Sequence, residues 1–144
     1  MKKLMIPAIV FMIVLFAALP IFACEMDFTL VSNGGEAETI TPGKTVTLDK
    51  DEVYTLSVTF TPDHGRCLLE PEDTVYLLED ERWKETKDYL PLVLLQSSEW
   101  DLLEGGSAEQ TLTLTGAETG KWDLEVIRDC TKGGYDEVIT FKVK

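Results

Sequence analysis

The most constraining feature of this sequence is the strict alternation of apolar and polar residues in several short runs. Residues 53–61 read VYTLSVTFT, residues 111–115 read TLTLT, and residues 121–130 read KWDLEVIRDC. Successive side chains of a β-strand point to opposite faces, and β-branched and aromatic residues favour strands. Each run therefore predicts a strand with one buried face.

Turn-forming residues separate these runs from shorter ones. Glycine and proline pairs occur at Gly34-Gly35, Pro42-Gly43 and Gly105-Gly106. Such residues adopt the backbone conformations that tight turns require. Seven to nine strands separated by frequent turns, with no alternation of strands and helices, predict an all-β, antiparallel β-sandwich. A chain of 144 residues has room for one such domain, which we place at residues 24–144.

The segment 71–90 fits two structures. Pro71, followed by two acidic residues, is typical of the first turn of a helix. The run TVYLL at residues 74–78 is instead typical of a strand, and we favour a hairpin here. The apolar run 89–96 then predicts a buried strand, with Pro91 at an edge or a bulge.

Residues 1–23 have the layout of a secretory signal, which we expect to form a helix. Lys2 and Lys3 are followed by residues 4–22, which carry no charge, and then by Ala23. A retained transmembrane anchor is the alternative, because the apolar stretch is long. Pro20 near its end favours a cleaved signal.

The residues Ile21-Phe22-Ala23-Cys24 resemble the lipobox of bacterial lipoprotein precursors, although that family usually has a smaller residue than Phe22. The resemblance implies that Cys24 becomes the first mature residue and is lipidated, which would anchor the protein to a membrane of the cell envelope. Ordinary cleavage after Ala23, which would give a secreted soluble protein, stays open.

The three cysteines are Cys24, Cys67 and Cys130. An odd number in an exported protein calls for an explanation. If Cys24 carries lipid, Cys67 and Cys130 are left to form a disulfide. Two unpaired buried cysteines, or a metal site that also uses His64, are the alternatives, but the close ligand spacing typical of metal sites is missing.

The chain is strongly acidic, with a net charge of −13. Two of its 13 basic residues and none of its 26 acidic residues precede Cys24, so the charge without the leader is −15. This charge argues against nucleic acid as a partner and favours a cationic ligand or protein. A simpler interpretation is that the charge keeps an exported protein soluble.

The run from Gly120 to Val126, GKWDLEV, resembles the Gly-x-aromatic-x-Leu-x-Val strand of immunoglobulin-like bacterial domains. The resemblance implies an immunoglobulin-like sandwich in which Trp122 packs at a sheet corner. A bridge between Cys67 and Cys130 on separate strands would suit that fold.

A weaker resemblance links Gly105-Gly106 and Arg128 to chagasin-like inhibitors of cysteine proteases, which present three loops to the protease cleft. Arg128-Asp129-Cys130 stands where that family has Arg-Pro-Trp, and the loop around His64 only partly matches the family's Asn-Pro-Thr-Thr-Gly loop. The implied loops should gather at one end of the sandwich.

Catalytic and cofactor motifs are sparse. His64 is the single histidine, and no serine lies in a Gly-x-Ser-x-Gly elbow. The sequence has no GxGxxG, GxxxxGK[ST] or HExxH motif, so we expect neither a cofactor nor an enzyme. A calcium site near residues 70–73 or 79–81 is conceivable but lacks the usual loop pattern.

Two tryptophans lie among charges, Trp83 in DERWKE and Trp100 in SSEWD. Each could be a partly exposed anchor for a partner or a sugar ring, or could cover an end of the sandwich. Together these features predict an exported, non-enzymatic binding module of the cell envelope. His64, Trp83, Trp100 and Arg128 are the candidate partner contacts. A protease inhibitor and a metal-binding envelope protein are the alternatives.

Overall fold

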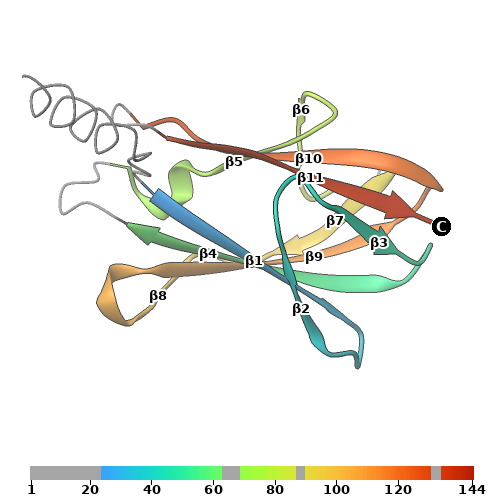
Figure 1. Cartoon of the computed structure of the whole chain (residues 1–144), viewed down its shortest axis with the longest axis horizontal. Coiled ribbons are helices and arrows are strands. Elements are labelled where there is room, and N and C mark those ends of the chain that lie inside the picture. Colours follow the sequence, from blue (N-terminus) through green and yellow to red (C-terminus); the bar gives the residue numbers. More distant parts are fainter. Residues whose placement is uncertain (1–23, 63–68, 87–89, 131–133) are drawn as a thin grey trace, which may run out of the picture.

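Two β-sheets lie face to face in the computed structural model, which describes residues 24–62, 69–86, 90–130 and 134–144 (Figure 1). The first sheet contains, in spatial order, β2 (Ala37–Ile40), β1 (Cys24–Ser32), β4 (Val53–Pro62), β9 (Ala108–Gly116) and β7 (Leu92–Ser97), with β8 (Asp101–Leu102) also paired to β9. The second contains β3 (Thr45–Leu48), β11 (Tyr135–Val143), β10 (Gly120–Arg128), β5 (Val75–Leu78) and β6 (Glu81–Arg82). The prediction of an all-β sandwich is confirmed.

The core forms between the inward faces of the long strands, as the alternation predicts. On β4, the residues from Tyr54 to Phe60 alternate between buried and half-buried. On β10, Leu124 and Val126 are fully buried and belong to the same hydrophobic cluster as Leu56 and Val58 of the other sheet. The polar positions between them point outward, because successive residues of a strand face opposite sides.

Among the described residues of the segment 71–90, β5 and β6 form the hairpin that we favoured over a helix. Pro71–Asp73 makes a single turn of 3-10 helix, after which β5 and β6 pair with Leu78 opposite Glu81. The two residues between them, Glu79 and Asp80, both have positive φ, 48° and 68°. This is the arrangement of a two-residue turn that matches the twist of the adjoining strands.

One strand pair departs from the antiparallel prediction. β3 runs parallel to β11, with Thr45 opposite Thr140 and Leu48 opposite Val143. The chain changes sheet after β2, through a turn in which the Gly43 N–H donates to the Val138 carbonyl at 3.0 Å. Because the chain crosses to the other sheet instead of folding back on β2, nothing requires β3 to be antiparallel to its new neighbour.

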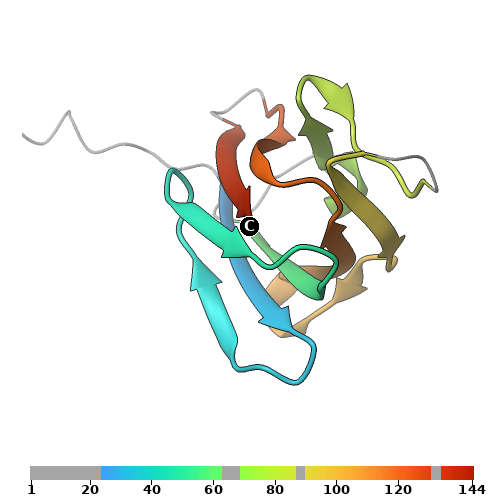
Figure 2. The ribbon, with the colours of Figure 1, turned by 90° about the vertical axis from the view of Figure 1, so that its right-hand side faces the viewer.

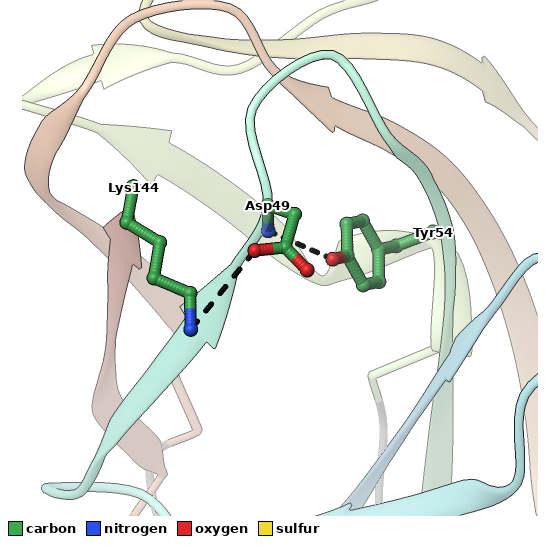
Figure 3. A network of polar contacts seen from close by, with 3 residues as sticks. All are labelled: Asp49, Tyr54 and Lys144. Carbon is green, nitrogen blue, oxygen red and sulfur yellow. Dashed lines mark hydrogen bonds and ion pairs between the residues drawn. The ribbon is translucent and has the colours of Figure 1, made fainter.

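Polar contacts join Asp49, which follows β3, to Tyr54 of β4 and to Lys144, which follows β11 (Figure 3). The Asp49 N–H donates to the Tyr54 hydroxyl at 2.8 Å, and Lys144 Nζ lies 4.0 Å from Asp49 Oδ1. The backbone continues the pairing, since the Lys144 N–H donates to the Leu48 carbonyl and the Lys50 N–H donates to the Lys144 carbonyl. The last residue is thereby held at the end of the sandwich opposite to the first residue of β1 (Figure 1).

The described residues contain eleven strands, more than the seven to nine predicted. β8 was not predicted, because it has only two residues and follows a bulge between Leu94 and Gln96 of β7. Together β7 and β8 form the outer edge of the first sheet along β9. Figure 2 shows this edge on the same side of the sandwich as β5 and β6.

Gly116, where β9 ends, offers a test of this packing. A Cβ at Gly116 would lie 2.6 Å and 2.8 Å from the two γ-carbons of Val143, which is 2% exposed. We expect Gly116→Ala to lower the free energy of unfolding by about 1–3 kcal/mol, measured by urea denaturation, because the stiff valine has no room to move. Val143→Ala in the same chain should recover part of the loss. Strictly additive effects of the two substitutions would contradict this explanation.

Candidate functional site

A groove lies between the β7–β8 edge of one sheet and the β5–β6 edge of the other. Its volume is about 800 Å³, within the range of small-ligand and peptide sites. Three aromatic residues and three carboxylates line it: Tyr76, Trp83, Trp100, Glu72, Glu85 and Glu99. Lys84 is the one basic residue in the lining that the structure describes.

Trp83 forms part of the inner wall of the groove. The side chain is 5% exposed, and its indole N–H donates to the Leu92 carbonyl at 2.9 Å. The backbone N–H of Trp83 also donates to the Tyr76 carbonyl at 3.0 Å. Trp83 is thus buried and not partly exposed, because a large apolar ring beside an open edge is stabilised by burial. Its role as a partner contact stays a prediction.

Trp100 keeps an accessible surface in the same groove. It is half-buried and packs against the core, just before β8 begins at Asp101. Trp100 also lines the groove, and its role as an anchor stays a prediction. Leu102, two residues further, is 79% exposed, the most exposed large apolar side chain among the described residues.

A polar network joins the two sheets at the base of the groove. The Tyr76 hydroxyl donates to Gln110 Oε1 at 2.9 Å, and Gln110 Nε2 donates to the Ser98 carbonyl at 2.9 Å. Burial raises the pKa of Tyr76 well above its usual range, although the charge of Arg128 opposes this shift. The hydroxyl therefore stays protonated and acts as a fixed donor.

Sequence reasoning did not identify Tyr76 or Gln110. A signal existed for Gln110, because it occupies the inward-facing parity of β9, shared with Ala108 and Leu112, where an apolar residue is expected. A polar residue on an inward face marks either a buried network or a ligand site.

Glu85 is held by one residue of the opposite wall. Its Oε1 accepts hydrogen bonds from both the hydroxyl and the backbone N–H of Ser97, each at 2.7 Å. These two bonds, the hydroxyl bond first, lower the pKa of Glu85 below its ordinary value. Glu85 is therefore a fixed negative charge at the rim of the groove.

Arg128 is fully buried, not presented on a loop. Its guanidinium carbon lies 3.9 Å from the centre of the Phe60 ring, and Nη1 donates to Thr74 Oγ1 at 2.7 Å and to the Pro71 carbonyl at 3.1 Å. Nη2 donates to the Leu69 carbonyl at 3.4 Å. Aromatic and carbonyl groups enclose its charge, so the guanidinium is not offered at the surface, and a contact between Arg128 and a partner stays a prediction.

The ends of β4 and β10 and the turn Glu104–Gly106 lie close together at one end of the sandwich, near this buried arginine. Thr61 Oγ1 and Ser107 Oγ lie 3.2 Å apart, which brings the end of β4 next to the turn at Glu104–Gly106. The contact of Arg128 with Phe60 adds the end of β10 to the same region. His64 lies outside the described residues.

Two of the three cysteines lie among the described residues. Cys24 is the first residue of β1, opposite Pro62, and is 4% exposed within the hydrophobic cluster. Cys130 is half-buried just after β10. Cys67 lies outside the described residues, so the disulfide with Cys130 remains a prediction.

Two carboxylates in the segments considered for calcium accept hydrogen bonds from the backbone. Asp73 Oδ2 accepts the Glu70 N–H at 2.9 Å, and Glu79 Oε1 accepts the Asp123 N–H at 3.1 Å. In the parts of the chain that the structure describes, no group of three or more His, Cys, Asp or Glu side chains is placed to hold a metal ion.

In comparisons with known proteins, no family model and no curated protein matches this chain.

The pairing of Glu85 with Ser97 predicts a pH dependence. A lowered pKa means that ionised Glu85 stabilises the fold above its ordinary pKa, and that this contribution is lost as the pH falls through the lowered value. Ser97→Ala should raise the pKa of Glu85 toward its ordinary value, measured by NMR titration of the carboxyl carbons. Ser57→Ala, on the outward face of β4, is the matched control and should leave the titration unchanged. An unshifted Glu85 in Ser97→Ala would refute this cause.

Proposed function

We propose that this chain is an exported, non-enzymatic binding module of the cell envelope and that the groove between β5–β6 and β7–β8 is its binding site. The observation that carries the proposal is the convergence of Trp83, Trp100 and Tyr76 with ionisable groups in one groove of about 800 Å³. Recognition sites typically combine an aromatic and apolar surface with a few fixed polar groups.

The electrostatics of the groove support binding rather than acid–base catalysis. A general acid at neutral pH needs a carboxyl pKa raised toward 7, whereas hydrogen bonds from Ser97 lower the pKa of Glu85. The high pKa of Tyr76 likewise keeps its proton on the hydroxyl, where it is bonded to Gln110. Both groups are fixed by the protein, which suits a preformed binding surface.

An immunoglobulin-like topology is part of the proposal. Trp122 packs against the core at the start of β10, and its indole N–H donates to the Glu118 carbonyl at 3.0 Å. Gly120, with φ of 154°, lies so close to the Trp122 ring that a Cβ would fall 2.8 Å from it. This corner supports the resemblance of the run 120–126 to immunoglobulin-like domains.

Attachment to the membrane is proposed through lipid on Cys24. No helix among the described residues is long and apolar enough to cross a bilayer. Cys24 is buried, so an acylated side chain must turn out of the core. Cys24 is the first residue of β1 and lies opposite Pro62, so the rearrangement would take place at the end of the sheet.

Lipidation predicts a definite modification. Intact-mass measurement of the protein from native membranes should show a chain that starts at Cys24 and carries a diacylglycerol adduct. Cys24→Ala should move the protein from the membrane fraction to the soluble fraction, or leave it as uncleaved precursor. A mature chain with unmodified Cys24 would contradict lipidation.

Inhibition of cysteine proteases is a second candidate function. It is favoured by the gathering of the ends of β4 and β10 and the turn Glu104–Gly106 at one end of the sandwich. Because Arg128 is buried, the contacts would fall to the exposed loop residues around it.

One cross-linking experiment separates the two candidates. A photoreactive amino acid is placed at Glu99 in the groove, at Glu104 in the end loops, or at Lys142 on the outward face of β11. The groove proposal predicts adducts of discrete mass in cells for Glu99 only, and their loss when Trp100 is also replaced by alanine. Adducts at Glu104 instead would favour the inhibitor, and equal yields at Glu99 and Lys142 would contradict a groove site.

A further inference from the structure

We infer that the groove takes an extended peptide segment that bears a lysine or arginine side chain next to an apolar residue. The inference rests on the proposed function and names the chemical class of its ligand. Three features of the groove support it, namely its charge, its aromatic surface and its size.

The charge of the groove favours a cation. Glu72, Glu85 and Glu99 lie around it with a single basic residue, Lys84. Glu85 in particular stays ionised to low pH, because Ser97 donates two hydrogen bonds of 2.7 Å to it. The net charge of −13 adds a long-range field of the same sign, which attracts cationic partners and speeds their association.

The aromatic surface gives the cation a second kind of contact. Trp100 is half-buried and Tyr76 lines the same groove, so a ligand ammonium or guanidinium between the carboxylates can lie against a ring face. The face of an aromatic ring is negative and attracts cations, and tryptophan does so most strongly. This protein already uses such a contact once, between Arg128 and Phe60 at 3.9 Å.

The size of the groove and its apolar margin favour a peptide over a lone amine. A volume of about 800 Å³ exceeds that of one lysine or arginine side chain. Leu102, 79% exposed, and Leu103, 43% exposed, follow Trp100 along the edge of the sheet. Because these exposed leucines follow directly after Trp100 of the groove, they offer an apolar surface to a residue next to the cation.

The test uses the purified full-length protein and three defined probes. The first is a six-residue peptide, capped at both ends, that has one lysine followed by one leucine among glycines. The second has norleucine in place of lysine, and the third is putrescine, a free diamine. Binding is followed by calorimetry and by tryptophan fluorescence at low and at high salt.

We expect the lysine peptide to bind at least about tenfold more tightly than the norleucine peptide or putrescine, and to weaken as salt is added. Trp100→Ala should weaken the lysine peptide by about tenfold, and Glu99→Gln by about threefold, without affecting the norleucine peptide equally. Glu38→Gln, on β2 at the opposite edge of the first sheet, is the matched control and should leave binding unchanged. Thermal unfolding of each variant confirms that it is folded.

Failure of the cationic peptide ligand and failure of the proposed binding function give different results. Two results would overturn the cationic ligand and leave the binding site. One is equal binding of the lysine and norleucine peptides. The other is no binding of the lysine peptide at millimolar concentration while cross-linking at Glu99 still depends on Trp100. Tightest binding of putrescine would replace the peptide by a free amine. Loss of the Trp100 dependence in cells would overturn the proposed function itself.

Discussion

The groove depends on one short stretch of backbone that is bonded to both sheets. Trp83 donates from its backbone to Tyr76 in the second sheet and from its indole to Leu92 in the first. Two residues later, Glu85 forms a parallel bridge with Leu94. The segment therefore fixes the separation of the sheets on this side and covers edge strands whose polar groups would otherwise lack partners. The aromatic wall and the carboxylate rim take their positions from it.

The fold was predictable wherever a strand was long enough to show its period. β1, β4, β9, β10 and β11 each run for nine or ten residues, so their buried faces are evident from the sequence. β6 and β8 have two residues each, which is too short to show an alternation. The direction of β3 was not predictable either, since it follows from where the chain crosses between sheets and not from local propensity.

The candidate site was only partly predictable for the same reason. Trp83 stands in a charged stretch, which suggests exposure, yet the backbone turns its ring inward while its neighbours face solvent. Arg128 also shows the limits of reasoning from charge. It continues the inward parity of Leu124 and Val126 on β10, and the Phe60 ring and nearby carbonyl groups compensate its burial. The position of Arg128 along β10, and the backbone path of Trp83 just after β6, decide the direction of each side chain, and not the polarity of the residue or of its neighbours.

The placement of the two ends of the domain has a geometric consequence for a lipid-anchored protein. Cys24 begins β1 at one end of the sandwich, and Lys144 is fastened beside Leu48 at the other, about 30 Å away for a strand of nine residues (Figure 1). If Cys24 carries the proposed lipid, the end of the sandwich that contains Cys24 would lie nearest the bilayer, and the end that contains Lys144 would lie farthest from it. The groove, which follows the side of the sandwich, would then open parallel to the membrane surface, toward other proteins anchored in the same membrane.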